Sequence, residues 1–298
     1  MRGNPRNQAG QIFRKLDRIG QSRHTAKQEA KAAGIVGSHN TAQTLGVFSF
    51  STMTKYRAIT TQFLQWCRDE HGVKDAARVT PDYVQEWLQV KIADGVRYKT
   101  FATYAAALGK MNTGLNAIYK RSDNWSVVIN ETRKQAREYL QRDTKSRSFL
   151  NPGILCDSLQ GVYRIAAQVQ YHGGARVKEI THLTDKHLLG NNTILLTNTK
   201  GGRRRVMTLP PELYEQVAGI IRQDGAFRFQ YRTYLRHLKA AALATGQPYM
   251  GSHGLRWNFA QRAVLDVQEN GLSYDEALEV VSERMGHSRK EITEHYLR

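Results

Sequence analysis

Hydrophobic side chains recur every three or four residues along much of this chain, which is the spacing of a helix that buries one face. In the first half, this spacing predicts four helices, over residues 51–72, 80–95, 98–120 and 130–142. The second has Pro81 at its first helical position, where proline is favoured because its missing N–H needs no partner there. Four successive helices of this kind indicate a compact helical bundle.

The pattern changes in the second half, where two short strand-like runs interrupt the helical stretches. The runs TILLTN (193–198) and RRVMTLP (204–210) predict strands joined by the glycine-rich turn TKGG. A helix is expected over 154–170, and RVKEITHL (176–183) is expected to begin another. The fold class is therefore mainly α with a small β-sheet, an α+β arrangement. Further helices are predicted over 211–223, 230–245, 253–269, 274–284 and 290–297.

Changes in composition divide the chain into four parts. Residues 1–34 carry eight Lys or Arg against two acidic residues, and we interpret them as a basic N-terminal segment with one short helix. Residues 35–142 are expected to form the helical domain, and 154–298 the mixed second domain. The stretch 143–153 is basic, lacks apolar periodicity and ends in Pro-Gly, which is typical of a linker. Two domains joined in this way are expected to form a C-shaped clamp around their partner.

The charge balance is strongly positive. The 298 residues include 44 Lys or Arg and 26 Asp or Glu, a formal net charge of +18, which favours a polyanionic partner. Nucleic acid is the first candidate. A membrane surface is the alternative, although no stretch approaches the roughly 18 apolar residues of a membrane span, and the first residues lack the apolar core of a signal peptide. Cys67 and Cys156 stand far apart, as expected for reduced thiols in a cytosolic protein.

The hexapeptide SHGLRW (252–257) places His253 and Arg256 three residues apart, on one face of a predicted helix. Ser252 is a suitable N-cap, so the pair would lie in the first turn, where free N–H groups favour an anion. Taken alone, this hexapeptide is better explained as a surface turn with two polar residues.

The second half also carries other motifs that are weak signals individually. In chain order the full set is GGARVKEI with Arg176 and Glu179, NTKGGRRR with Lys200, SHGLRW with His253 and Arg256, MGHS with His287, and EHYL with Tyr296.

In this order and at this spacing, the five motifs resemble the tyrosine recombinase family of phage-type integrases, whose pattern is Arg, Lys, His-x-x-Arg, His or Trp, and Tyr. The resemblance covers 154–298, and the helical region 40–142 is similar to that family's core-binding domain. It implies a site-specific DNA recombinase that integrates or excises a mobile element. The implied partners are double-stranded DNA, further copies of the chain in a homotetramer on two DNA sites, and accessory DNA-bending or directionality factors. No cofactor, no metal and no membrane are implied, and the protein is expected in the cytoplasm, associated with the nucleoid.

The residue types suit attack on a DNA phosphodiester, an anion whose transition state carries extra charge on its non-bridging oxygens. Arg176 and Arg256 can neutralise that charge with forked guanidiniums. His253 can either hydrogen-bond the same oxygens or manage the proton of the attacking group. Tyr296 is a weak nucleophile because a tyrosine hydroxyl has a pKa of about 10, and surrounding cations would lower the cost of forming the phenolate.

Three other residues receive roles. Lys200 is the candidate acid that protonates the leaving 5′-oxygen, although the basic run beside it could instead hold phosphates. Glu179 is expected to orient Arg176, and the resemblance assigns His287 as a further phosphate donor. A 5′-hydroxyl can reverse the resulting 3′-phosphotyrosyl link without ATP or metal, and the sequence contains no GxxxxGK[ST] or HExxH motif. The candidate contacts to DNA phosphates are Arg142, Lys145, Arg147, Arg203, Arg204 and Arg205.

Two other functions stay open on the sequence alone. A tyrosine-type topoisomerase would use the same chemistry to relax a single duplex. A non-catalytic DNA-binding protein would keep the fold without the reaction, and the complete set of site residues argues against it. Only two residues follow Tyr296, whereas many members of the family continue with a segment that docks on the next protomer. The way in which protomers would interlock therefore stays open.

Overall fold

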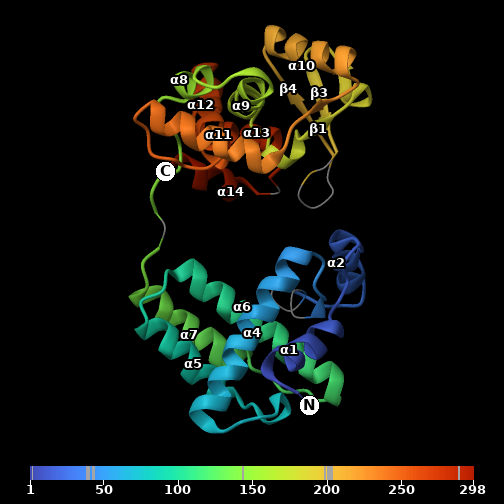
Figure 1. Ribbon diagram of the computed structural model, residues 1–298, viewed down its shortest axis with the longest axis vertical. Helices are drawn as coiled ribbons and strands as arrows, with labels where there is room; N and C mark the ends of the chain where they lie inside the picture. The colour runs from blue at the N-terminus through green and yellow to red at the C-terminus, as the bar shows by residue number, and fades with distance from the viewer. Residues whose placement is uncertain are drawn as a thin grey trace. The chain divides into compact units, whose positions relative to one another are not determined.

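The computed structural model describes residues 1, 3–37, 41, 44–142, 144–197, 199, 204–287 and 289–298. The chain divides into two compact units, Met1–Asp143 and Thr144–Arg298, which are called unit 1 and unit 2 below (Figure 1). Each unit has a hydrophobic core of its own.

Unit 1 is built from helices, and the four helices expected from the hydrophobic spacing are present. The first of the four is capped by Ser49, whose side chain accepts a hydrogen bond from the backbone N–H of Thr52. The last lies a few residues earlier than expected. The helices of the unit are α1 (Pro5–Arg14), α2 (Arg23–Ala32), α4 (Phe50–His71), the 3₁₀ turn Ala76–Arg78, α5 (Pro81–Ala93), α6 (Tyr98–Tyr119) and α7 (Ser126–Tyr139).

The N-terminal segment is not separate from the helical domain. It contains two helices and not the single predicted one, and the first of them, α1, packs against α4 and α6. The side chains of Ile12 and Phe13 are fully buried in the core of unit 1. The approach is close, since a Cβ atom built on Gly114 of α6 would lie 2.6 Å from the Ile12 side chain. Burial of this apolar stripe therefore fixes α1 within unit 1.

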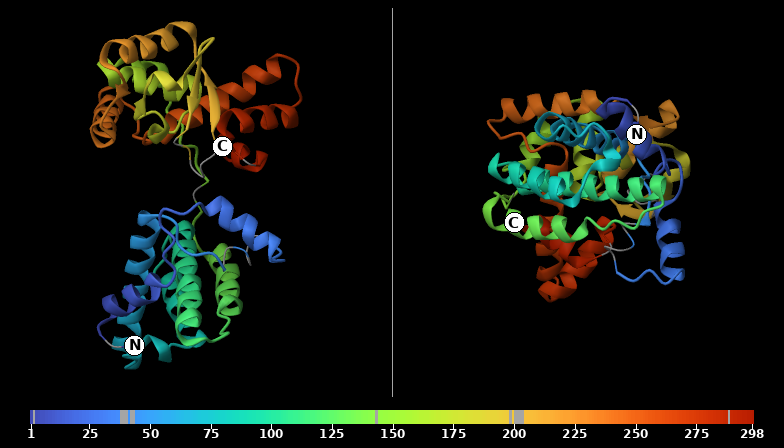
Figure 2. Two further views of the ribbon diagram at one scale, coloured as in Figure 1. Left: turned by 90° about the vertical axis from the view of Figure 1, so that its right-hand side faces the viewer. Right: turned by 90° about the horizontal axis from the view of Figure 1, so that it is seen from below.

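Unit 2 combines helices with two small antiparallel sheets (Figure 2). The two strands predicted around the glycine-rich turn are confirmed, and they pair with Ile194 opposite Met207 and Leu196 opposite Arg205. The strands are β1 (His182–Leu183), β2 (Leu188–Gly190), β3 (Thr193–Leu196), β4 (Arg205–Thr208) and β5 (Phe227–Arg228). A third strand completes the sheet of the predicted pair in the order β2-β3-β4, and β1 pairs with β5. The helices are α8 (Pro152–Asp157), α9 (Gly161–Gly173), α10 (Pro211–Asp224), α11 (Tyr231–Ala244), α12 (His253–Glu269), α13 (Tyr274–Met285) and α14 (Lys290–Glu294), followed by the 3₁₀ turn His295–Leu297.

Two predictions for unit 2 were wrong. The single helix expected over 154–170 is two helices, α8 and α9, with the break at 158–160. The stretch RVKEITHL does not begin a helix. It forms the 3₁₀ turn Val177–Glu179 and then β1, because pairing with β5 gives His182 and Leu183 strand partners.

The end of the predicted linker belongs to unit 2. Phe149 is buried in the core of this unit. Its backbone N–H donates to Asn258 Oδ1 at 3.0 Å, and its carbonyl accepts from Asn258 Nδ2 at 2.9 Å. Two backbone bonds to one buried side chain thus attach this segment to α12.

Helix α12 is the central helix of unit 2. Leu255 on one side belongs to the larger apolar cluster of the unit, whereas Trp257 and Phe259 belong to a second cluster shared with α13. The first turn of α12 is therefore held from both sides. No helix in the described part of the chain is long and apolar enough to cross a membrane.

Candidate functional site

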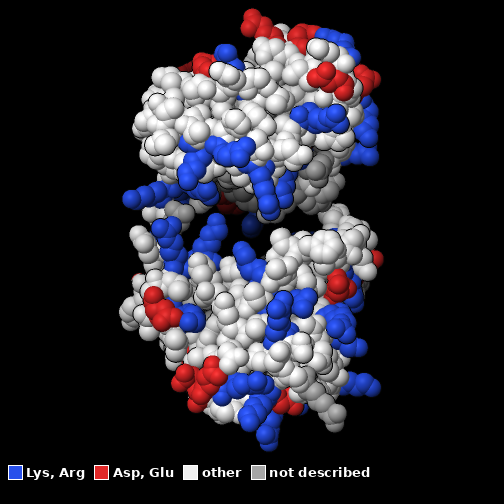
Figure 3. Space-filling view, in the orientation of Figure 1, with Lys and Arg blue, Asp and Glu red and all other residues white. Residues whose placement is uncertain are grey.

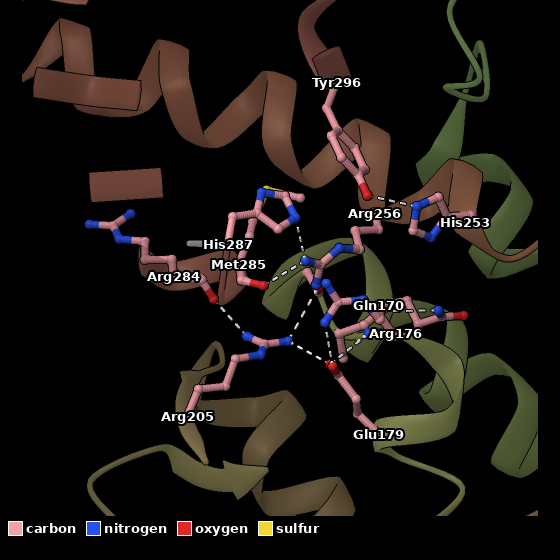
Figure 4. A network of polar contacts seen from close by, with 12 residues as sticks. Gln170, Arg176, Glu179, Arg205, His253, Arg256, Arg284, Met285, His287 and Tyr296 are labelled. Carbon is pink, nitrogen blue, oxygen red and sulfur yellow. Dashed lines mark hydrogen bonds and ion pairs between the residues drawn. The ribbon is translucent and has the colours of Figure 1, made fainter. Parts of the chain in front are cut away.

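The first turn of α12 holds His253 and Arg256, as the sequence predicts. Ser252 occupies the N-cap position, but its side chain makes no capping hydrogen bond, which differs from the expectation. Arg256 is completely buried. Its guanidinium donates to the carbonyl oxygens of Gly174 and Met285, the latter at 2.6 Å (Figure 4). Backbone carbonyls from two other segments thus hold the arginine in place.

A tight turn after α9 brings Arg176 to the same place. Gly174 ends α9 in the left-handed conformation, with φ at 63°. A Cβ atom there would lie 2.3 Å from the Phe259 ring, so the chain needs glycine at this point. Gln170 fixes the turn by donating to the carbonyl oxygen of Ala175 at 3.1 Å. The GGAR stretch is therefore shaped by its contacts with α12.

Glu179 joins two arginines. Its Oε1 accepts from Arg176 Nη1 at 2.7 Å, and its Oε2 accepts from the Arg176 backbone N–H at 2.9 Å and from Arg205 Nη2 at 2.8 Å. Burial alone would raise the pKa of Glu179, but Arg205 and Arg176 together hold it below its ordinary value. The carboxylate is thus an ionised anchor shared by both guanidiniums.

Arg205, predicted as a contact to DNA phosphates, lies within this cluster, a position that the sequence did not predict. Its side chain is only 8% exposed, and besides Glu179 it donates to the carbonyl oxygen of Arg284 at 2.6 Å. The strand periodicity could have revealed this, since Arg205 shares one face of β4 with buried Met207 while Val206 faces outward. The run of three arginines concealed that alternation.

Arg176, Arg205 and Arg256 form an arginine cluster that has a surplus of positive charge. Burial and then the charges of Arg176 and Arg205 lower the pKa of Arg256 to about 10, while Tyr296 and Glu179 oppose the shift. The guanidinium still carries its charge at neutral pH. Its Nε is buried and has no hydrogen-bond partner among the described residues. One carboxylate faces three guanidiniums here, so this cluster favours an added anion.

Tyr296 reaches the same cluster from the end of the chain. Its hydroxyl lies 2.7 Å from His253 Nε2 (Figure 4). The ring is 7% exposed and packs against Trp257, with the ring centroids 5.1 Å apart. Trp257 follows Arg256 on α12, so one helix turn positions both the Arg256 guanidinium and the ring against which Tyr296 packs.

His287 completes the site from the turn after α13. Its Nε2 lies 3.0 Å from Arg256 Nη2, and its Nδ1 lies 2.8 Å from Thr293 Oγ1. Burial and then the charge of Arg256 lower the pKa of His287 to about 3, so the ring is neutral at pH 7. Sequence reasoning missed Thr293, for which only its place three residues before Tyr296 gives a signal.

The structure brings six of the predicted site residues together: Arg176, Glu179, His253, Arg256, His287 and Tyr296. Lys200 and Arg203 lie outside the described residues. Among the other candidate phosphate contacts, Arg204, Lys145 and Arg147 are exposed, and Arg142 lies over the Tyr98 ring of unit 1 at 5.5 Å.

The arrangement combines an anion-binding cluster with a hydroxyl that contacts an imidazole. Such a site can hold an oxyanion beside a nucleophile whose proton has an acceptor within reach. No group of three or more His, Cys, Asp or Glu side chains that could hold a metal ion occurs within the part of the chain that the structure describes.

Residues 148–298 match the sequence profile of the Phage integrase family, and this segment contains every residue of the site. No curated protein sequence matches the chain significantly.

Several solved structures share the fold. The chain superposes on the Tn1549 transposon integrase in complex with transposon right end DNA with a TM-score of 0.60, at 16% identity and covering 98% of this chain and 95% of that one. For the same integrase in complex with circular intermediate DNA, the TM-score is 0.57 at 17% identity, covering 97% and 95%. A lambda integrase dimer bound to a core site gives 0.55 at 12% identity, covering 100% and 81%.

Proposed function

This chain belongs to the phage integrase family, and on that premise we propose that it is a site-specific recombinase that cleaves and rejoins double-stranded DNA through a 3′-phosphotyrosyl link. One observation carries the proposal. The Tyr296 hydroxyl lies 2.7 Å from His253, beside a cluster of three arginines that has a surplus of positive charge.

The arginines bind the scissile phosphate in this mechanism. The Arg176 side chain is 24% exposed, whereas Arg256 is buried. Fixed donors that are already in place stabilise the charge that develops on the non-bridging oxygens without further rearrangement. Glu179 and Arg205 hold Arg176 in position and have no direct role in the reaction.

His253 accepts the proton from Tyr296 as the phenolate oxygen attacks phosphorus. The 2.7 Å contact favours this role over a bond to the phosphate oxygens. The bond from phosphorus to the 5′-oxygen then breaks, and Lys200 gives that oxygen a proton. A 5′-hydroxyl from the same or another strand reverses these steps, which releases Tyr296 and rejoins the backbone.

Unit 1 supplies contacts to the DNA backbone. A groove of about 900 Å³ between the first turns of α4 and α6 is lined by three cations, Lys55, Arg97 and Lys99, together with the hydroxyls of Ser51, Thr54, Thr100 and Thr103. Its described lining includes no acidic residue. On the visible face of each unit, Lys and Arg outnumber Asp and Glu (Figure 3). Cations and hydroxyls are the groups that bind phosphate oxygens.

The assembly and setting are part of the same proposal. We expect the two units to close around the duplex as a clamp, four copies to act on two DNA sites, and accessory factors to bend the DNA or set direction. The integration or excision of a mobile element, on DNA of the nucleoid, is the proposed biological role.

A nicked suicide duplex tests the reaction. The duplex is first selected by binding from a random-sequence pool and then nicked so that the cleaved end diffuses away. We expect a covalent protein–DNA adduct that Tyr296→Phe abolishes without loss of duplex binding. No adduct, or one that persists in Tyr296→Phe, would remove the proposal. Relaxation of a plasmid without exchange between two duplexes would instead indicate a topoisomerase.

A further inference from the structure

Thr293 lies in a chain of hydrogen bonds that leads away from the arginine cluster. It sits on α14, three residues before Tyr296, and is completely buried. Its Oγ1 is 2.8 Å from His287 Nδ1 and 2.6 Å from the Oγ of Ser282, a buried residue of α13. The reaction described above uses neither hydroxyl.

The direction of these hydrogen bonds follows from one fact, that a guanidinium has donors only. Because Arg256 Nη2 lies 3.0 Å from His287 Nε2, this nitrogen must accept and carries no proton. The neutral ring therefore has its proton on Nδ1, which donates to Thr293 Oγ1. The hydroxyl proton of Thr293 is then free to point at Ser282 Oγ.

From this geometry we propose that Thr293 is a positioning residue. It accepts from His287 Nδ1–H and so stabilises the tautomer that Arg256 requires, in which His287 Nε2 orients Arg256. The proposal rests on the proposed function of the site. In the other tautomer, the Nε2 hydrogen would face a hydrogen of Arg256 Nη2. Since Nη2 also donates to the Met285 carbonyl oxygen, both of its hydrogens have acceptors only while the Nδ1–H form persists.

This assignment changes the expected role of His287. The resemblance makes it a hydrogen-bond donor to the phosphate, but the nitrogen that faces the arginine cluster is an acceptor here. His287 then acts on the phosphate through Arg256. Thr293 also links the contact between His287 and Arg256 to the short segment that carries Tyr296. The same segment thus helps to position both Arg256 and the Tyr296 nucleophile.

Thr293→Val tests the proposal because valine keeps the shape and removes the acceptor. Under single-turnover conditions with saturating suicide duplex, we expect the cleavage rate to fall about tenfold, as for the loss of one buried hydrogen bond. Duplex affinity should change less than twofold, and Thr293→Ser should restore most of the rate. The control is Thr245→Val, which removes a hydroxyl that bonds the Ala241 carbonyl oxygen at the end of α11, and it should cleave normally.

The tautomer is measured directly, and without DNA, by nitrogen NMR of protein labelled at histidine, with His287→Gln to assign the signal. Wild type should show protonated Nδ1 and unprotonated Nε2, and Thr293→Val a mixture. A wild-type ring protonated on Nε2 would overturn the inference, as would a Thr293→Val protein with unchanged tautomer and rate. If Thr293→Val does not fold, the wild-type spectrum and Ser282→Ala decide. If wild type has the expected tautomer but forms no covalent adduct with DNA, the proposed function is wrong while the inference about Thr293 stands.

Discussion

Glu179→Gln is the substitution that most directly probes the arginine cluster. It keeps the size of the side chain but removes the negative charge that Arg176 and Arg205 share. Glutamine retains one acceptor oxygen and replaces the other with an NH₂ group, which would face an arginine donor. Three guanidiniums then lie together without the carboxylate that offsets them, so unit 2 should lose stability.

The magnitude follows from burial. Removing one partner of a buried ion pair costs about 3–5 kcal/mol. The Arg205 side chain is 8% exposed and cannot be solvated easily, whereas that of Arg176 is 24% exposed and partly can. We therefore expect a loss of about 3 kcal/mol. For a unit of this size, each kcal/mol lowers Tm by about 2–4 °C, so the Tm of unit 2 should fall by about 6–12 °C.

Urea unfolding and calorimetry measure this loss. The matched control is Glu215→Gln, because Glu215 bonds Arg222 at the same distance of 2.8 Å but both side chains are about 60% exposed; it should cost less than about 1 kcal/mol. The folded pKa of Glu179 is lowered, so its contribution is present above the ordinary value and is lost as the pH falls through the folded value. A Glu179→Gln protein no less stable than the control at pH 7 would refute the reasoning.

Four further predictions follow from the same structure. Because the pKa of His287 is lowered to about 3 in the folded protein, the unfolded chain binds a proton at a higher pH than the folded one does. Wild type should therefore lose stability as the pH falls from about 6.5 toward 3. The His287→Gln protein should lose less stability over the same range, as measured by urea unfolding. Arg176→Ala should lower cleavage at least ~10²-fold while duplex Kd changes little in a salt titration. Lys200→Ala should regain cleavage on a duplex in which sulfur replaces the leaving 5′-oxygen. If cleavage is not restored, Lys200 is not the acid that protonates the leaving oxygen. Gly114→Val should clash with Ile12 and destabilise unit 1 by about 1–3 kcal/mol in urea.

The helices of both units could be predicted because hydrophobic spacing reports burial on one face, and the fold class is confirmed. The break between α8 and α9, the strand β1 and the docking of α1 could not, since they depend on tertiary contacts. The stripe that includes Ile12 and Phe13 indicated a helix, but only its fit against α4 and α6 places it in the core.

The site shows the same division. The order of motifs identified the family, and the family profile confirms that prediction. Arg205 had only the strand alternation as a signal, which the basic run conceals, and Thr293 had none beyond its place near Tyr296, because a lone threonine carries no motif. Their roles depend on partners far apart in sequence, Glu179 for Arg205 and His287 for Thr293.

The central claim is that one tyrosine becomes covalently bonded to DNA beside the arginine cluster. Digestion of the adduct followed by mass spectrometry maps the junction on both partners. We predict a single peptide linked through Tyr296 to a 3′-phosphate, leaving a free 5′-hydroxyl. Attachment through Tyr249, Tyr274 or His295, or to a 5′-phosphate, would contradict this account.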